Sequence, residues 1–594
     1  MSNIFFTEKD GKFTIPIPEE GFTTNDENSE FTDGFFVSWS YPLTLFFNAE
    51  LKRILGDLSN PNVSRGKWEI AGFLTKYGEV FPSKMKISMK GLEGKVNFEF
   101  GVASLDVMDK KLSELDLGTI ETGNLYDYID VNLYGRYPYT PVCFPRIRTP
   151  ENYQETVGNL YGGFNVFNET DRTDVSVFRN EFSSAGQAIF NFIKPIVYFI
   201  HILVKGFESA GYELAGDILT DEDLMYIGFN HNNIADVELV HEVKRIPYNW
   251  TLLGYGTATQ TFDLLGGYIF SLILDNDDSW ITMEVTNITT NQVLYVAYKQ
   301  GYDDMNPGMS KEFFYTLPIF EETTKVRVDL TFINNNNAPQ PDVELFVAYL
   351  NPAGGTEKKA YYLPETLVLN KYVPDATFID VVKSAKILKH YTFSLENNVI
   401  WMNKIKNTLP EKVHDYKFSE QEDVSIAGND LKGYIFKFSA PEEFEFLQYM
   451  YDSNGFVKAE KEIKDEGYEE RELLAYPMPL TNNLYEKAAD QVNNEVSGLP
   501  MVGYDGEGFR NHPLNLSYLT IPNIYENSYK NSLTGRLTAN TFKWAFFTKN
   551  PMAMHLKSSD CIYAYGAFHK IRNVFKKHHL NNVTELEIES ENRY

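Results

Sequence analysis

Apolar and polar residues alternate along much of the chain with a period of two, which is typical of β-strands. In the N-terminal part this alternation predicts strands at 36–40, 68–72, 85–89 and 96–100. A short helix is predicted at 49–55, because Gly56 supplies the glycine that commonly ends a helix. Residues 1–30 are polar and rich in Glu, Asn and Thr, and we expect them to form an extended arm.

Between 131 and 239 the alternation gives way to loops and helices. Aromatic and Pro-rich residues at 131–180 are typical of ordered loops packed on a neighbour, with a substrate groove as the alternative. A helix is predicted to begin at Pro195, since proline suits the first helical turn. Its apolar run at 196–204 is too short for a membrane span, which takes roughly 20 residues. Thr220 and Asp223 resemble a capping box and predict a second short helix through Met225. The polar stripe of the first helix consists of Tyr198, His201, Lys205 and Glu208.

Residues 240–355 read as a separate all-β domain. Strand-like runs at 268–274, 280–286, 292–297, 312–317, 325–332 and 343–349 are separated by Asn, Asp, Gly and Pro turns. Such short strands with regular turns predict a β-sandwich of the jelly-roll kind. The four asparagines at 334–337 are expected to form a polar loop between the last two strands.

A helix and a hairpin are predicted within 356–425. Thr377 can cap the helix with Asp380 three residues on. The hairpin joins strands at 391–395 and 399–405 through the polar turn at 396–398. The apolar face of the helix consists of Phe378, Val381, Val382, Ala385 and Leu388.

From 426 to 594 the pattern returns to strands. The charged stretch at 458–472 is predicted to be a solvated hairpin or a short helix, and runs at 562–566, 570–576 and 583–589 predict a three-stranded meander. The whole pattern predicts a mainly β fold with minor α (α+β) in several domains. The predicted boundaries are 1–30, 31–130, 131–239, 240–355, 356–425 and 426–594.

Composition adds to this picture. Aromatic residues make up 15% of the 594, which favours sheet and also fits a subunit with large contacts. A chain of this length needs about three to five domains. Its net charge of −28 argues against nucleic-acid binding and against adhesion to anionic membranes, and a solvated acidic face is expected. No signal peptide is visible, so synthesis in a host cytoplasm is expected.

No residue pattern points to catalysis, a cofactor or a metal. Cys143 and Cys561 are the only cysteines and are far apart, which excludes a disulfide framework and a Cys-based zinc site. His578 and His579 are adjacent, so in a strand they point to opposite faces. The acidic runs at 275–278 and 505–508 lack EF-hand spacing and are interpreted as turns. We therefore predict no catalytic, cofactor-binding or metal residues and no enzyme, although 82 Asp and Glu leave an acid pair undetectable from sequence.

The order of three segments resembles the tail-tip or baseplate hub proteins of tailed bacteriophages. The segments are the strands at 35–108 that lead to 115–118, the helix after Pro195 with its continuation at 211–219, and the run from Leu363 and Pro364 through 374–383 to the hairpin that ends at 399–402. The resemblance implies tube-like, hub-like β domains at 31–130 and 426–594, with 240–355 as an insertion. It also implies a homotrimer that forms a ring between tail tube and tip in the virion, with other tail proteins as partners and no catalytic residues.

Three alternatives stay open beside the tail hub. The chain could be another virion structural protein, such as a ring, fibre base or capsid-associated subunit. The domain at 240–355 could bind a host surface glycan. A polysaccharide-degrading tail enzyme is the third alternative, because its two acids would carry no distinctive motif.

Overall fold

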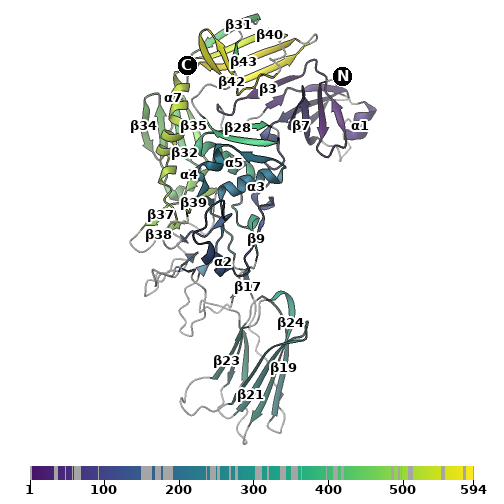
Figure 1. The fold of residues 1–594 in the computed structure, drawn as a ribbon, viewed down its shortest axis with the longest axis vertical. Coiled ribbons are helices and arrows are strands. Elements are labelled where there is room, and N and C mark those ends of the chain that lie inside the picture. The colour runs from purple at the N-terminus through teal and green to yellow at the C-terminus, as the bar shows by residue number, and fades with distance from the viewer. Residues whose placement is uncertain are drawn as a thin grey trace.

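The structure is a computed structural model, and it is mainly β, with several sheets and minor helix (Figure 1), which confirms the predicted fold class. The domain boundaries themselves stay a prediction. The structure describes residues 3–31, 38–46, 48–56, 58, 68–90, 93–148, 163–167, 176–177, 191–235, 237–240, 249–250, 255–266, 269–274, 279–300, 311–316, 320–334, 343–348, 359–362, 364, 366–396, 398–405, 413–415, 420–482, 487–491, 496, 498–505, 513–549, 555–579 and 583–592.

The N-terminal residues belong to a sheet, and the predicted extended arm is wrong. β1 (Ile4–Glu8) pairs with β2 (Thr14–Pro16) on one side and with β6 (Glu69–Lys76) on the other. Ile4, Phe6 and Ile15 alternate inward and are buried, and polar residues that suggested an arm, such as Asp26 and Asn28, are buried against the C-terminal strands. The predicted strands of this region are confirmed as β4 (Ser38–Ser40), β6, β7 (Glu79–Lys90) and β8 (Glu93–Phe100), with β5 (Leu43–Phe46) added.

The predicted helix at 49–55 is confirmed as α1 (Ala49–Leu55). The Asn48 side chain accepts a hydrogen bond from the backbone N–H of Leu51 at 2.9 Å, which satisfies one free donor of the first turn. Gly56 follows with a φ of 88°, a conformation that favours glycine.

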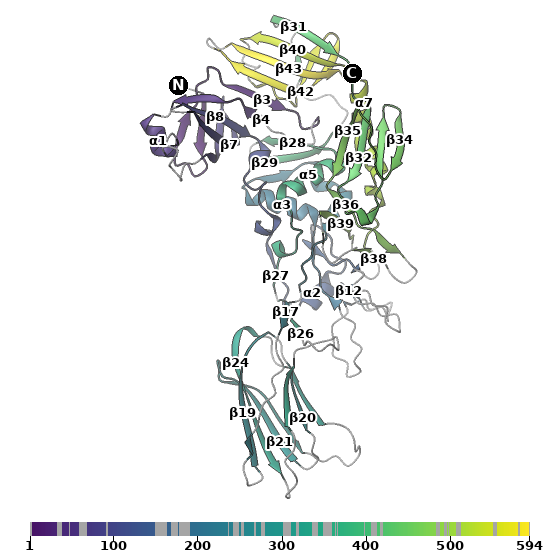
Figure 2. The same ribbon diagram turned by 180° about the vertical axis from the view of Figure 1, so that it is seen from behind.

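Strands from the two ends of the chain share one sheet. β3 (Thr23–Glu27) pairs with β4 on one edge and with β42 (Ala567–His578) on the other, so that Thr24 faces Lys576 and Asp26 faces Val574. The main strand order is β2-β1-β6-β7-β8-β4-β3-β42, followed by β43 (Thr584–Asn592), β40 (Thr541–Thr548) and β31 (Glu420–Ala427). The prediction of separate N- and C-terminal β regions missed this junction, which both views show at one end of the molecule (Figures 1 and 2). We call this element the joined sheet.

The C-terminal half of the joined sheet contains the predicted meander. β41 (Cys561–Ala564), β42 and β43 (Thr584–Asn592) pair in sequence order, which confirms it. β40 (Thr541–Thr548) and β31 (Glu420–Ala427) extend the sheet to its edge, and β30 (Val413–Asp415) pairs with β41. Trp544, Phe546 and Ile588 lie in the core of this half.

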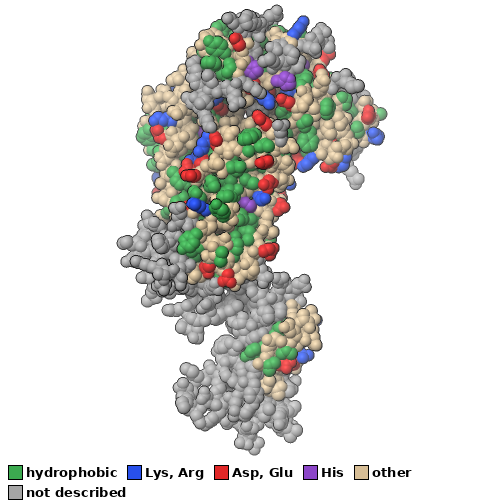
Figure 3. Space-filling model, viewed as in Figure 1, with side chains coloured by type: hydrophobic (Ala, Val, Ile, Leu, Met, Phe, Trp, Pro, Cys, Tyr) green, Lys and Arg blue, Asp and Glu red, His purple; other side chains and the backbone are tan. Residues whose placement is uncertain are grey.

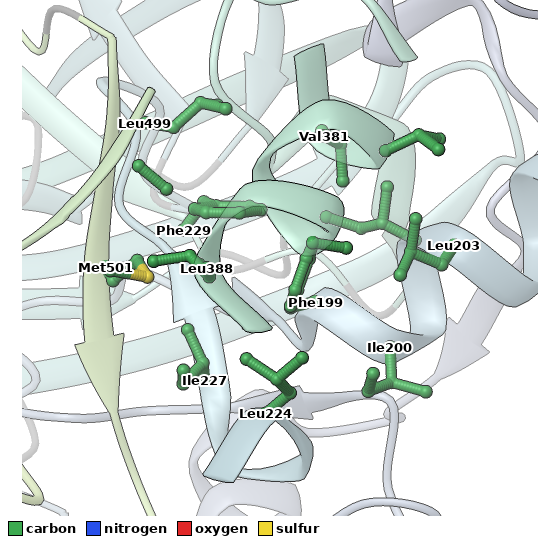
Figure 4. Close-up of a cluster of buried hydrophobic side chains, with 14 of the residues drawn as sticks. Phe199, Ile200, Leu203, Leu224, Ile227, Phe229, Val381, Leu388, Leu499 and Met501 are labelled. Atoms are coloured by element: carbon green, nitrogen blue, oxygen red, sulfur yellow. The ribbon is translucent and has the colours of Figure 1, made fainter. Parts of the chain in front are cut away.

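Two helices cross in the middle of the molecule around its largest core (Figure 4). α5 (Phe378–Lys389) is confirmed with its Thr377–Asp380 capping box and its buried apolar face. α3 (Phe199–Ser209) packs against α5 at Gly206, where an added Cβ would lie 2.1 Å from a ring carbon of Phe378. The absence of a side chain at Gly206 therefore lets the two helices approach closely.

Two details of the predicted helices are corrected. α3 begins at Phe199 and not at Pro195, because 196–197 form β14 (Ile196–Val197), which pairs with β10 (Val142–Cys143). α4 (Glu222–Met225) is capped by Asp221, whose carboxylate accepts from the N–H of Asp223 at 3.2 Å, and not by Thr220. Thr220 and Asp221 are adjacent, and both have short polar side chains that favour the N-cap position. The sequence pattern therefore placed the cap one residue too early.

The predicted hairpin is confirmed as β28 (Tyr391–Glu396) and β29 (Val399–Lys404), with β15 (Glu213–Ala215) parallel to β29. The prediction for 458–472 is wrong. β34 (Gly455–Glu460) and β35 (Tyr468–Leu473) lie at opposite edges of a sheet in the order β34-β33-β32-β35, with β33 (Gln448–Asp452) and β32 (Gly433–Phe438) between them. The pattern also missed a helical run of α6 (Ile521–Ile524), a π-helical turn at Tyr525–Tyr529 and α7 (Lys530–Thr538).

The predicted sandwich strands are confirmed within the described ranges. The two sheets of this domain have the strand orders β18-β19-β24-β21-β22 and β23-β20-β25. They lie at the end of the molecule that is far from the joined sheet (Figure 2). The paired β17 (Val237–Val240) and β26 (Lys359–Tyr362) connect them to the rest. The jelly-roll topology and glycan binding stay predictions. The strands are β18 (Asn249–Trp250), β19 (Tyr255–Gly266), β20 (Ile269–Leu274), β21 (Ser279–Asn287), β22 (Gln292–Gln300), β23 (Lys311–Thr316), β24 (Phe320–Asn334) and β25 (Val343–Ala348).

Short elements fill the region between the helices and the sandwich. They are β9 (Thr119–Glu121), α2 (Leu125–Asn132), β11 (Ile147–Arg148), β12 (Gly163–Phe164), β13 (Asn191–Phe192), β16 (Ile227–Phe229), β27 (Thr366–Val368), β36 (Ala475–Pro477), β37 (Leu480–Asn482), β38 (Lys487–Asp490) and β39 (Leu499–Gly503). Figure 3 shows acidic side chains spread among apolar ones over the central part of one face, as expected from the net charge. No helix in the described ranges is long and apolar enough to cross a bilayer.

Candidate functional site

A cavity of about 110 Å³ lies where the N-terminal strands, the C-terminal strands and the hairpin β28–β29 meet. We call it the junction cavity. Its walls come from β3, from the β6–β7 hairpin, from β28 and from the segment 555–559, with Lys576 of β42 completing them. Because these segments are distant in sequence, the cavity exists only when both chain ends are folded together.

Three buried charged side chains line the cavity. Lys576 Nζ lies 3.7 Å from a carboxylate oxygen of Asp26 and also donates to the backbone carbonyl of Leu556. Burial alone would raise the pKa of Asp26, but Lys76 and Lys576 together hold it below its usual value. Burial lowers the pKa of Lys576 to about 8, against the opposing effect of Asp26. The pair is therefore an ion pair that Asp26 keeps charged at neutral pH.

Lys76 has a different environment from Lys576. Its Nζ lies 5.1 Å from the ring centre of Phe100 and 5.8 Å from that of Phe81, and the residue is 7% exposed. Lys76 also interacts electrostatically with Asp26, so the two lysines share one buried carboxylate. Aromatic faces stabilise a cation only partly, so Lys76 retains the capacity to bind an anion.

Polar side chains complete the wall. Asn28 donates from Nδ2 to the backbone carbonyls of Ser558 and Ile571, both at 2.9 Å, and accepts from the N–H of Glu30 at 3.0 Å. The Ser558 hydroxyl is fully buried and has no hydrogen-bond partner among the described residues. An unpaired buried hydroxyl costs free energy unless something in the cavity bonds to it.

Ionisable side chains also stand at the more exposed side of the cavity. Glu79 lies 3.9 Å from His555 Nδ1 and 3.8 Å from Lys557 Nζ, and all three side chains are 41–52% exposed. Ion pairs that are this exposed contribute little to stability. They form a polar rim around the buried part of the cavity.

A second cluster surrounds the buried Lys194. Its Nζ donates to Asn230 at 3.0 Å and to Gln491 at 3.2 Å, and lies 4.2 Å from the ring centre of Phe164. Burial lowers the pKa of Lys194 to about 7, a value that could activate a lysine nucleophile. Lys194 is only 1% exposed, however, and its ammonium group donates to the neutral side-chain amides of Asn230 and Gln491. The arrangement joins three chain segments and offers a substrate no access.

Acids near α4 are engaged in structural contacts. Asp221 accepts from the Tyr391 hydroxyl and lies 2.9 Å from Lys404 Nζ, while Asp223 pairs with Lys389. The pKa of Tyr391 is raised by burial and by Asp221. Since these acids hold cationic and hydroxyl partners, they anchor α4 to α5 and to the hairpin, and do not form a free general acid–base pair.

The sequence-derived candidates do not converge on a site. His578 is buried, whereas His579 points outward and bonds Glu585 at 2.8 Å. Cys143 and Cys561 are both buried and free. No group of three metal-binding side chains occurs among the residues described. The acidic run at 275–278 lies outside the described residues, as do 506–508 and 335–337.

Sequence reasoning missed the junction cavity, although a signal was present. Lys76 occupies an inward position of β6, in phase with the buried Ile70 and Leu74. Lys576 likewise lies between the inward Val574 and His578 of β42. A lysine in the buried phase of an alternating strand marks a charge that needs a partner.

Comparisons with known proteins identify no family. No protein-family model matches, and no curated protein matches. Among solved structures, the tail protein from Neisseria meningitidis MC58 is 8% identical, with a TM-score of 0.19, over 57% of this chain and 96% of that one. The 43 kDa tail protein of prophage MuSo2 from Shewanella oneidensis is 7% identical, with a TM-score of 0.18, over 57% and 98%.

A further solved structure belongs to the Gx strain of infectious bursal disease virus. It is 10% identical, with a TM-score of 0.13, over 23% of this chain, and the match spans 33% of that chain. TM-scores this low carry no conclusion about this chain. The fold itself defines the class: a mainly β protein of several sheets.

Proposed function

We propose that this chain is a virion structural protein, and specifically a subunit of a phage tail hub or tip that assembles with copies of itself into a ring. The order of the three segments described above supports this role. The proposal includes no catalytic activity, because the buried lysine and the acids around α4 have structural partners.

The pairing of β3 with β42 is the observation that carries the structural role. Strands from both ends of the chain are neighbours inside this sheet. Detaching either chain end from the sheet therefore breaks the backbone hydrogen bonds between β3 and β42. The junction is reinforced by buried ion pairs, among them Lys570 with Glu30 and Lys576 with Asp26. This construction suits a subunit that must keep its shape within a particle.

Self-association is supported by an open edge of the joined sheet. β31 ends the strand order, and within the described strands its outer edge has no partner. Ile426 on this strand is 62% exposed, and the nearby Tyr565 is 68% exposed. An exposed edge strand with apolar side chains favours pairing with another chain. We propose that this edge contacts a neighbouring copy in the ring.

Antibody labelling of intact particles tests the location. An antibody against the sandwich strands β19–β25, seen by electron microscopy, is expected to mark the end of the tail. Label on the head or neck would show another virion role and contradict the hub. Particles that carry no label anywhere, although the chain is produced in the same cells, would contradict the virion assignment altogether.

A further inference from the structure

We propose that the junction cavity binds a small oxyanion of the inorganic phosphate class, held by the ammonium group of Lys76 and the hydroxyl of Ser558. The bound anion would join strand β6 to the segment 555–559, in a cavity that β28 and β42 also line. This inference rests on the cavity alone and is independent of the proposed tail function.

The balance of charge in the buried wall favours an anion. Lys76 and Lys576 supply two positive charges, and Asp26, which lies 3.7 Å from Lys576 and also interacts electrostatically with Lys76, supplies one negative charge. The buried wall therefore has one positive charge in excess, and Lys76 lies against two aromatic rings. A buried charge without a counter-charge is costly, so an anion in the cavity is favoured and a cation is opposed.

The hydroxyl of Ser558 provides an independent indication. It is fully buried, lines the cavity and bonds nothing in the described chain. Hydroxyl and ammonium donors that line one cavity are groups that charged oxygen acceptors bind strongly. The negative side chains of the wall are Asp26, which interacts with both lysines, and Glu79 and Glu396. Glu79 lies 3.8 Å from Lys557 Nζ.

The size of the cavity limits the ligand. A buried water needs about 10–15 Å³ of such space. The observed volume of about 110 Å³ therefore accommodates one tetrahedral oxyanion with a few waters. Lys557 at the rim attracts an approaching anion, and Glu79, 3.8 Å from its Nζ, moderates that attraction.

Calorimetric titration of the full chain with inorganic phosphate in chloride buffer at pH 7 tests the site. Wild type is expected to show saturable binding with one anion per chain. Lys76→Met is expected to weaken binding at least tenfold, and Ser558→Ala several-fold. Lys86→Met is the matched control, because Lys86 is 40% exposed on β7 and pairs with Glu99 at 2.5 Å. No binding by wild type, or equal affinity in Lys76→Met, would overturn the proposal.

Ser558→Ala keeps the test decisive even where Lys76→Met does not fold. Without phosphate this variant is expected to be as stable as wild type, since it removes only an unpaired hydroxyl. Phosphate should slow amide exchange in β3, β28 and β42 of wild type and much less in the variant. Phosphate also stabilises proteins generally by exclusion from their surface. Equal protection of both proteins would therefore contradict a specific site.

Discussion

Replacing Asn28 with Ala should loosen both ends of the chain at once. The substitution removes two hydrogen bonds to backbone carbonyls, at Ser558 and Ile571, and one from the N–H of Glu30. Each buried hydrogen bond contributes about 1 kcal/mol net, and unsatisfied groups cost more, so local stability should fall by about 3 kcal/mol. Since 1.4 kcal/mol is a factor of ten, opening should become roughly a hundredfold more frequent.

Hydrogen exchange followed by mass spectrometry measures this opening segment by segment. It suits a chain of several domains, for which one global unfolding free energy is not defined. In oxyanion-free buffer, exchange should accelerate together in β3 and β42. The control is Asn454→Ala, because Asn454 is exposed in the turn between β33 and β34 and should change exchange by no more than about twofold. Acceleration confined to β3, with β42 as protected as in wild type, would refute the reasoning.

Three further predictions concern the central helices and the joined sheet. Gly206→Ala should lower the midpoint of thermal unfolding, because the added Cβ would lie 2.1 Å from the ring of Phe378 and overpacking costs about 1–3 kcal/mol. An unchanged midpoint would contradict the close packing of α3 against α5. Asp380→Ala removes the capping box of α5 and should cost about 1 kcal/mol, seen as faster exchange in the first turn. Burial, with Lys76 and Lys576 nearby, lowers the pKa of His578 to about 4, below the usual value near 6.5. The neutral imidazole therefore stabilises the fold above pH 6.5, and this contribution is lost as the pH falls towards 4. His578→Gln should therefore reduce the loss of stability between pH 6.5 and 4, by up to about 3 kcal/mol in urea titrations, whereas His555→Gln, at a half-exposed position, should not.

Local signals in the sequence predicted local structure well. The helix α5, its capping residues and the following hairpin were predicted because the cap, the apolar face and the turn all lie within about thirty residues. The same holds for the meander, whose strands follow one another closely in the sequence. The cap of α4 was misplaced by one residue, because Thr220 and Asp221 are both good helix caps and only the folded chain decides between them.

Features that depend on distant segments were not predicted. The pairing of Thr24 with Lys576 joins residues more than 500 positions apart, and no pattern within either strand specifies the other. The N-terminal segment was predicted to be an arm because polar residues such as Asp26 and Asn28 are buried only through contacts with the distant C-terminal strands. The junction cavity needs four such segments at once, so sequence could only indicate that Lys76 occupies a buried phase.

The central proposal is a ring-forming tail subunit, and the native mass of the purified chain tests it most directly. Light scattering or native mass spectrometry at micromolar concentration is expected to give one species of about 205 kDa, three times the 68.3 kDa chain. The same sample should show rings by electron microscopy. A stable monomer of 68.3 kDa, which stays monomeric when tail proteins from the same particle are added, would contradict the proposal.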